Sequence, residues 1–511
     1  MLKRLQRLGD SGYLILFVIL IFIACFSQIR NEIYFDEGLF ETVGYYMSHG
    51  HVLYHDLADT KPPLLYLLGY LNSILFGDSL IAPRFFMSVV TALTVIPLSL
   101  ICKGYFSRTT AYLASLLYLT SILTKSFGYE MHPDSLLSFF GLWSVYLLFT
   151  GLGGGRYWRI LLAGVSLGLM GATKQSAVFL LLVSVSYLLA ARKNVLTSLV
   201  LFSTGLAIVS AAFLIYLASN GSLHDALYYV IMFGPEHMGG GSVNVLSSMP
   251  GRIVVLFTIA FINPLAYSGA VYAVPRIIKS GSQEKRFILT WFIIEAMDLL
   301  FVYPHLFPTH FILLTFLSYI LAPDALPTFI VYLKRLHKRT NWLFKGLIVY
   351  TAGFFLLIQI SGLLSNPSDN NAITLEDNTF VGSYLNETIP ENQTLLILAN
   401  PIYYVLSGRN PPAAFMNTSI VPYFDHFTYV FVYANDTELQ TFSNQIETTK
   451  VDYILVERGQ VIMPDPLGEV NSVYKYSSLN EVFKRYDTYS EINFRHKGKT
   501  KQFYLLKLRQ D

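Results

Sequence analysis

Apolar segments long enough to cross a lipid bilayer recur along most of this 511-residue chain. A membrane-spanning helix needs roughly 17–25 such residues, and eleven segments approach that length. They are residues 13–29, 82–101, 110–125, 134–150, 158–173, 176–191, 196–218, 251–275, 287–303, 310–333 and 341–363. Only 14% of the residues are charged, whereas a soluble domain averages about 25%. The sequence therefore predicts a mainly α polytopic membrane helix bundle with about eleven transmembrane helices.

Charged residues in the connections between these segments separate by sign. Lysine and arginine occupy alternate connections, and the cytoplasmic loops of membrane proteins are enriched in these two residues. The basic positions are Lys3, Arg4, Arg7, Lys103, Arg108, Arg156, Arg159, Arg192, Lys193, Arg276, Lys279, Lys285, Arg286, Lys334, Arg335, Lys338 and Arg339. We therefore predict an integral multi-pass protein of the plasma (cell) membrane. Its N-terminus is predicted to be cytoplasmic, and its first segment to be a retained span.

The composition changes after Leu364. Residues 1–364 form the predicted transmembrane domain, and residues 365–511 form a predicted small α/β domain on the extracytoplasmic side. Its predicted strands are 394–399, 429–434, 452–457 and 503–508, and its predicted helices are 375–387, 437–449 and 479–487. Asn-x-Ser/Thr sequons lie on the predicted outer face at Asn220, Asn386, Asn392, Asn417 and Asn435. They are candidate glycosylation sites, although such triplets are also common by chance.

The first predicted outer loop carries the densest set of polar residues. Asp36 and Glu37 follow the first span directly, in the stretch YFDEG. Acids at a membrane boundary are costly unless they are solvated or used, and a pair of solvated interfacial acids is the simpler interpretation. The same loop ends in DLADTKPP, which contains Asp59 and Lys61. Its two prolines favour a helix start, so residues 64–76 are predicted to form an interfacial or re-entrant helix, and Lys61 is placed to meet a lipid phosphate.

Other predicted outer connections contribute further candidates. The stretch YEMHPD contains Glu130, His132 and Asp134, and the alternative role for Asp134 is to cap the helix that follows it. Lys174 ends the fifth segment, where it could instead extend to the membrane interface. The remaining candidates are Arg84 at the start of the second segment, Glu236 and His237 in GPEHMGGG, and His310 or His305 in YPHLFPTH.

These motifs, in this order, resemble the C-type glycosyltransferases (the GT-C superfamily), in the branch that holds protein O-mannosyltransferases and the lipid A aminoarabinose transferase. The resemblance covers roughly residues 30–325. It implies the GT-C fold and makes Asp36, with its neighbour Glu37, the catalytic position assigned to acceptor activation. Asp59 fits the acid that precedes the Lys-Pro-Pro motif, although Thr60 stands where the aminoarabinose branch has Glu.

The resemblance also implies two ligand contacts. Lys174 matches a lysine that faces the donor phosphate. Glu236-His237 resembles a loop in which a histidine joins an outer-loop carboxylate on a metal ion, so His237 with Asp59 could hold a divalent metal. The alternative is that His237 is simply exposed to solvent.

The predicted function follows from the location of these residues. An enzyme on the outer face has no nucleotide sugar within reach, so its donor must be a sugar on a polyprenyl phosphate. Such a donor needs cations for its phosphate and a base for the acceptor hydroxyl. We expect Lys61 and Lys174, with Arg84 or His310, to supply the cations. We expect Asp36 to act as the base. Asp59, Glu130, His132, Asp134 and Glu236 complete the predicted substrate-binding set.

The expected enzyme is a glycosyltransferase without a nucleotide cofactor and without a nucleic-acid partner. Inversion at the anomeric carbon is implied by the resemblance alone. The acceptor could be a protein, a glycolipid or a polysaccharide. The alternatives are a polytopic lipid or sugar transporter or flippase, and a lipid-linked glycan ligase on the same scaffold. Transporters usually show internal repeats and functional polar residues at the membrane midplane. In this sequence the candidate acids and histidines cluster in outer loops and no repeat is evident, which favours the enzyme.

Overall fold

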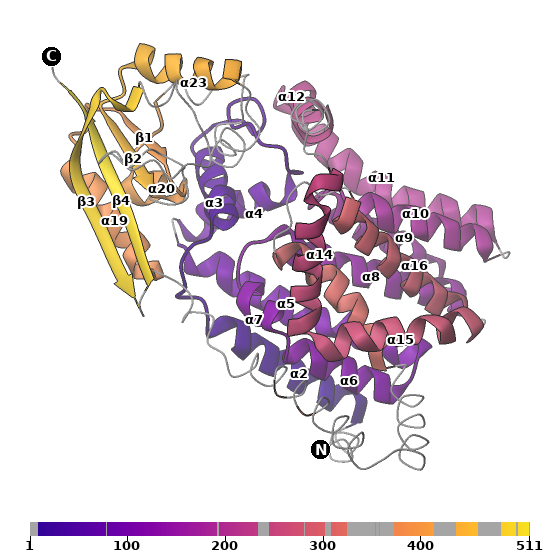
Figure 1. Cartoon of the computed structure of the whole chain (residues 1–511). Coiled ribbons are helices and arrows are strands. Elements are labelled where there is room, and N and C mark those ends of the chain that lie inside the picture. The colour runs from indigo at the N-terminus through magenta and orange to yellow at the C-terminus, as the bar shows by residue number, and fades with distance from the viewer. Residues whose placement is uncertain are drawn as a thin grey trace. The chain divides into compact units, whose positions relative to one another are not determined.

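The computed structural model describes residues 9–77, 79–191, 194–232, 245–280, 282–301, 308–323, 353, 357, 373–412, 436–457, 482–496 and 499–509. The chain divides into two compact units, each described here by itself. The first unit comprises residues 1–29, 84–213 and 244–365, and the second comprises residues 30–83, 214–243 and 366–511. Figure 1 shows that the described residues are mainly helical, with one small sheet.

The first unit is built from helices alone in its described residues. They are α2 (Gly9–Phe26), α5 (Ile81–Tyr105), α6 (Arg108–Leu119), α7 (Ile122–Phe127), α8 (Pro133–Gly154), α9 (Tyr157–Gly171), α10 (Ala177–Ala190), α11 (Val195–Ser219), α14 (Val245–Ile262), α15 (Pro264–Ser280), α16 (Gln283–Phe301) and a final helix that follows the 3₁₀ turn η2 (Pro308–Phe311). The first residues of α5 and the last residues of α11 belong to the second unit. A single apolar cluster, which includes Trp291, forms the core.

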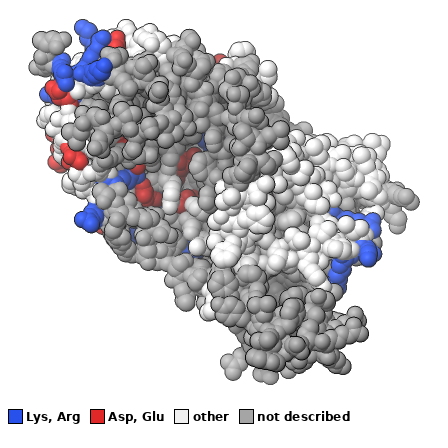
Figure 2. All heavy atoms as spheres, in the orientation of Figure 1, with Lys and Arg blue, Asp and Glu red and all other residues white. Residues whose placement is uncertain are grey.

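Three described helices are long and apolar enough to cross a membrane, namely α5, α8 and α11. Several shorter apolar helices coincide with other predicted spans, among them α2, α9 and α10. On the face drawn in Figure 2, most of the described residues are neither acidic nor basic, as a lipid-facing bundle requires. The predicted number of eleven spans is not reached in the described residues, and residues 341–363 lie almost wholly outside them.

Two predicted spans are broken in the structure. Residues 110–125 form α6 and the short α7, because Ser121 accepts a hydrogen bond from the Thr124 amide and starts a new helix. Residues 251–275 form α14 and α15, which meet at an angle of 107°. Pro264 begins α15 and has no amide hydrogen to continue α14. Each of these predicted spans therefore corresponds to two helices.

The charge separation along the sequence has a counterpart in the contacts of the first unit. Two connections predicted to be cytoplasmic meet where the Lys285 ammonium lies 4.8 Å from the centre of the Phe106 ring. Nearby, Tyr187 donates a hydrogen bond to Glu284. Two connections predicted to lie outside meet at Asp134 and Lys174. Each of these contacts joins connections that were predicted to lie on the same side.

The second unit contains the α/β sheet together with the first loop of the chain. Its helices and turns are α3 (Phe35–Ser48), α4 (Leu64–Phe76), α12 (Leu223–Leu227), η1 (Tyr228–Met232), α19 (Leu375–Thr388), α20 (Ile402–Ser407) and α23 (Asp436–Thr449). Its strands are β1 (Leu395–Leu398), β2 (Tyr453–Glu457), β3 (Tyr486–His496) and β4 (Lys499–Leu508), in the order β1-β2-β4-β3. β1 and β2 are parallel, and the other pairs are antiparallel.

Most predictions for this part are confirmed, and one is confirmed only in part. The strands predicted at 394–399, 452–457 and 503–508 correspond to β1, β2 and β4, while the strand predicted at 429–434 lies outside the described residues. Within the helix predicted at 479–487, residues 482 and 483 are helical, and residues 486 and 487 begin β3. The rest of β3 was not predicted, because most of its residues are polar and exposed, as suits a strand at the edge of the sheet.

Candidate active site

The first loop brings three predicted residues together at the start of α3. Lys61 Nζ lies 3.8 Å from Asp36 Oδ1 and 4.0 Å from Asp59 Oδ1. The Asp59 side chain is fully buried, whereas the Asp36 side chain is 38% exposed. One cation therefore lies between two carboxylates, of which only Asp36 is open to a ligand. Glu37 occupies the same helical turn but is buried.

Local structure explains why Asp36 and Lys61 lie where they do. Asp36 and Glu37 occupy the first turn of α3, where the helix dipole stabilises negative charge. Tyr54 donates a hydrogen bond of 2.7 Å to the Lys61 carbonyl. Burial, reinforced by Asp59, raises the pKa of Tyr54 well above its ordinary value, so the phenol stays protonated as a donor. The Lys61 ammonium also lies 5.5 Å from the centre of the Phe40 ring.

Two glycines let α3 and α4 approach each other closely. A Cβ atom on Gly44 would lie 2.2 Å from the backbone of Gly69, and a Cβ atom on Gly69 would lie 2.5 Å from the Phe40 carbonyl oxygen. The sequence does not predict this close approach, although Gly44 and Gly69 both lie inside helices, where glycine is unfavourable. The prediction that residues 64–76 form a short helix is confirmed by α4.

A second group of predicted residues lies in the first unit, at the start of α8. Lys174 Nζ is 2.8 Å from Asp134 Oδ1, and His132 Nδ1 is 3.4 Å from Asp134 Oδ2. His132, and not Asp134, caps the helix, because its ring nitrogen accepts a hydrogen bond from the Asp134 amide. Asp134 is buried and the Lys174 side chain is only 12% exposed. His310, in η2, is within electrostatic reach of Asp134.

Two acids on α16 join this group and were missed in the sequence. Glu295 and Asp298 are both buried, at 5% and 4% exposure. Trp291 donates a hydrogen bond of 2.9 Å to Glu295, and both acids are within electrostatic reach of Lys174. They lie inside the predicted span 287–303, and intramembrane acids are rare unless they have a function. That signal was present in the sequence.

The remaining predicted residues have different surroundings. The Arg84 side chain is buried, donates a 2.6 Å hydrogen bond to the Ile29 carbonyl and lies 5.3 Å from the centre of the Tyr129 ring. It therefore ties the end of α2 to α5. Glu130 is also buried. Glu236 and His237 lie outside the described residues, as does His305.

The predicted metal site gains no support from the described residues. In that part of the chain no group of three or more histidine, cysteine, aspartate or glutamate side chains is arranged to hold a metal ion. The predicted ligand His237 is not among these residues. The Asp59 carboxylate already accepts a hydrogen bond from the Thr60 amide and lies 4.0 Å from Lys61 Nζ.

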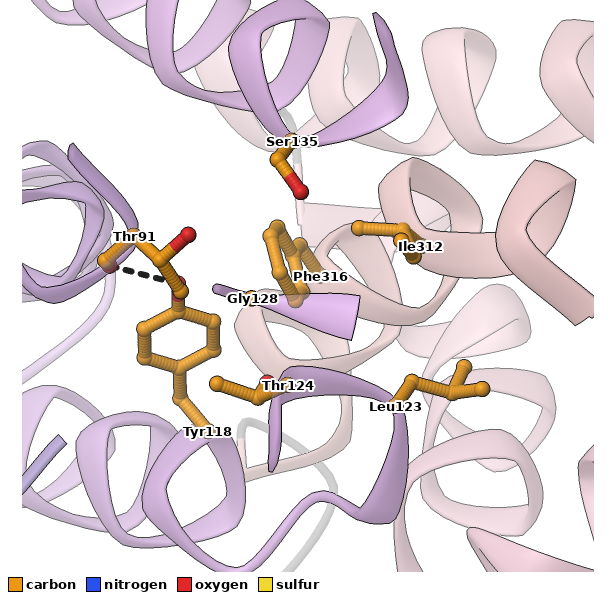
Figure 3. A pocket seen from close by; sticks show the side chains of 8 residues that line it. All are labelled: Thr91, Tyr118, Leu123, Thr124, Gly128, Ser135, Ile312 and Phe316. Atoms are coloured by element: carbon orange, nitrogen blue, oxygen red, sulfur yellow. Dashed lines mark hydrogen bonds between the residues drawn. The ribbon is translucent and has the colours of Figure 1, made fainter. Parts of the chain in front are cut away.

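A small cavity in the first unit is lined by Thr91, Tyr118, Leu123, Thr124, Gly128, Ser135, Ile312 and Phe316 (Figure 3). Its volume of about 10 Å³ fits roughly one water molecule. The hydroxyls of Thr91 and Thr124 are buried there with no protein partner. The cavity is too small for a sugar or a lipid tail, so it is part of the packing and not a substrate pocket.

Comparison with known proteins gives one family and a set of similar structures. Residues 60–217 match the dolichyl-phosphate-mannose-protein mannosyltransferase family. No curated protein sequence matches the chain. ArnT from Cupriavidus metallidurans, in a structure with undecaprenyl phosphate, is 13% identical, with a TM-score of 0.59 over 97% of this chain and 98% of that one.

The archaeal oligosaccharyltransferase AglB from Archaeoglobus fulgidus is similar as well. Its structure with an inhibitory peptide and a dolichol-phosphate is 12% identical, with a TM-score of 0.57 over 96% of this chain and 74% of that one. A second structure of this enzyme, tethered to an acceptor peptide, gives a TM-score of 0.56 at 13% identity over 99% of this chain and 75% of that one. The resemblance to the GT-C glycosyltransferases is thereby confirmed: the chain has their fold, and its residues 60–217 match the protein mannosyltransferase family.

Proposed function

We propose that this protein is a membrane glycosyltransferase that moves a sugar from a polyprenyl-phosphate donor to an acceptor hydroxyl on the outer face of the membrane. The observation that carries the proposal is the group of Asp36, Asp59 and Lys61, which combines a half-exposed carboxylate with a cation. The similar structures support the donor class, since ArnT is bound to undecaprenyl phosphate and AglB to a dolichol-phosphate.

In the proposed reaction Asp36 accepts the proton of the acceptor hydroxyl. The acceptor oxygen then forms a bond to the anomeric carbon, and the bond from that carbon to the phosphate oxygen breaks. The phosphate keeps the electron pair and leaves on the lipid, with its charge stabilised by a cation. A direct displacement of this kind inverts the anomeric configuration.

Of the two candidate lysines, Lys61 is the better phosphate ligand. Its side chain is 23% exposed, against 12% for Lys174, and its distances of 3.8 and 4.0 Å to two carboxylates are longer than a strong hydrogen bond. Lys174 makes a 2.8 Å bond to buried Asp134. Breaking that bond would leave a buried carboxylate without its cation, which typically costs about 3–5 kcal/mol. We therefore propose that Lys61 contacts the phosphate, whereas Lys174 compensates the buried Asp134 carboxylate at the start of α8.

The proposal extends to the topology. Eleven spans with a cytoplasmic N-terminus place the α/β domain and the first loop outside, where a lipid-linked donor and a protein, glycolipid or polysaccharide acceptor would meet. Residues 1–364 are the proposed transferase domain, and residues 365–511 are the proposed outer domain. A metal at His237 with Asp59 remains a separate proposal, tested by adding a chelator to the transfer assay.

The test is transfer by the purified protein from a set of polyprenyl-phosphate sugars, with the Asp36→Asn variant beside the wild type. We expect kcat to fall by at least about 10²-fold, the usual contribution of a general base. Asp56→Asn is the matched control, because Asp56 lies in the same loop and only accepts a bond from the Val52 amide. If Asp36→Asn keeps the wild-type rate, the mechanism is wrong. Movement of the lipid across liposomes without covalent transfer would favour the transporter instead.

A further inference from the structure

The α/β domain holds the segment that leads into the Asp36 turn. The Leu375 amide donates a 3.0 Å hydrogen bond to the Arg30 carbonyl, and Asn31 forms a β-bridge with Thr374. Glu32 pairs with Lys501 on β4. Each residue from 30 to 32 is thus fixed by a residue more than 300 positions away in the sequence, and no feature of the loop sequence itself accounts for these contacts.

Asn400 makes the contact that lies nearest to Asp36. It follows β1 directly and is buried, at 4% exposure. Its Nδ2 donates a 2.8 Å hydrogen bond to the Ile33 carbonyl, while its Oδ1 accepts a 3.1 Å bond from the Ile402 amide. Because both ends of the amide are engaged, the side chain cannot rotate without losing a buried hydrogen bond. Figure 1 shows α20, which begins beside Asn400, next to α3.

Asn400 also fits against the first turn of α3 with no space to spare. A Cβ atom on Gly38 would lie 2.0, 2.8 and 3.0 Å from Oδ1, Cγ and Nδ2 of Asn400. All three nearest atoms therefore belong to one side chain. Gly38 is two residues from Asp36, and its amide donates to the Tyr34 carbonyl in the turn that carries both acids. Any displacement of Asn400 or of Gly38 is consequently passed to this turn.

We propose that Asn400 is a positioning residue for the transfer reaction: it holds the first turn of α3 so that the Asp36 carboxylate lies where the acceptor hydroxyl needs it. The catalytic part of this inference rests on the proposed function. The structural part, that Asn400 fixes the first turn of α3, does not depend on the proposed function. The α/β domain would then act on catalysis through a contact that is not itself part of the chemistry.

The test is a double-mutant cycle with Gly38→Ala, Asn400→Ala and the double variant, measured on the full chain. Gly38→Ala forces a methyl group into the Asn400 amide, and a misplacement of this kind can lower kcat by about 10²-fold. Asn400→Ala loses one hydrogen bond and should lower kcat by about tenfold. In the double variant the methyl group occupies the space that Asn400 leaves, so kcat should return to the level of Asn400→Ala, with the KM for the donor unchanged throughout.

Hydrogen exchange of the amides in residues 34–42 supplies a readout that does not depend on activity. We expect faster exchange in both single variants and a partial return in the double variant relative to Gly38→Ala. Tyr486→Phe is the control, because it removes a buried hydrogen bond to the Val451 carbonyl elsewhere in the same domain and should change neither readout.

The outcomes separate the two proposals. If the wild-type protein transfers sugar but the effects of the two substitutions are additive, Asn400 does not position the turn, while the proposed function stands. If the wild-type protein transfers no sugar, the proposed function fails, and the exchange cycle alone decides the positioning role. Unchanged exchange in Gly38→Ala would refute that role in either case.

Discussion

Lys501 should be the most sensitive single position in the α/β domain. It lies between two carboxylates, with Nζ 2.9 Å from Glu457 and in contact with Glu32. The side chains of Lys501 and Glu457 are 10% and 5% exposed. Burial lowers the affinity of the lysine for its proton, but Glu457 and Glu32 outweigh this and raise the pKa of Lys501 above its ordinary value. The lysine is therefore charged and holds two acids that have little access to water.

Lys501→Met keeps most of the volume and removes the charge. Removing one partner of a buried ion pair typically costs about 3–5 kcal/mol, because the other partner is left without compensation. Here two carboxylates would remain, although Glu32 is the more exposed at 16% and can be partly solvated. We therefore expect the free energy of opening of β2 and β4 to fall by about 3 kcal/mol, near the lower end of that range.

Native-state hydrogen exchange on the full chain in lipid nanodiscs measures this opening strand by strand. Lys507→Met is the matched control on the same strand. Lys507 contacts the Tyr453 and Tyr489 rings at 5.4 and 5.3 Å, and such cation–π contacts at partly exposed sites contribute about 0.5–1 kcal/mol. If Lys501→Met costs no more than Lys507→Met, the buried triad contributes no more than a surface contact, and the reasoning fails.

Two further predictions concern the same unit. Burial raises the pKa of Glu457 from 4.5 to about 7 in spite of Lys501, so this carboxyl binds a proton more tightly in the folded domain than in the unfolded one. Its contribution to stability is fully present below pH 4.5 and is lost as the pH rises through 7, by a total of about 3 kcal/mol. The opening free energy of β2 between pH 5 and pH 8 checks this, and a Glu457→Gln variant should flatten the profile, whereas an unchanged slope would refute it. Gly44→Ala should separate α3 from α4, because its Cβ would meet the Gly69 backbone at 2.2 Å. Overpacking of this kind costs about 1–3 kcal/mol, and hydrogen exchange of the α4 amides measures it. The exposed Gly50 is not suitable for a matched Gly→Ala control, because it has a positive φ.

The sequence predicts what depends on local pattern. Long apolar runs predict the helices of the first unit, and the alternation of charge places Asp134 and Lys174 on the same predicted side of the bundle. The proximity of Asp36 to Lys61 follows from their placement in one loop. Each of these inferences uses residues that are close in sequence or a rule that acts on every connection alike.

The parts that escaped prediction depend on contacts between distant residues or on a single backbone atom. Pro264 turns one apolar run into two helices, since a missing amide hydrogen outweighs the hydropathy of the surrounding residues. Glu295 and Asp298 were overlooked because the mean hydropathy of their segment stays high, since the two acids lie among many apolar neighbours. The contact between Gly38 and Asn400 joins residues 362 positions apart, and no sequence pattern around either residue predicts it.

These long-range contacts change how the outer domain should be understood. Composition divides the chain after Leu364, but contacts group residues 30–83 with residues 366–511. The first loop therefore folds with a domain that is synthesised more than 300 residues later, and the contacts of Asn400 and Lys501 with this loop form only then. A chain truncated after residue 364 would keep every predicted apolar span and Lys61. It would lose the hydrogen bond that holds Ile33 and the ion pair that holds Glu32, so it should insert into the membrane and bind lipid phosphate without transferring sugar.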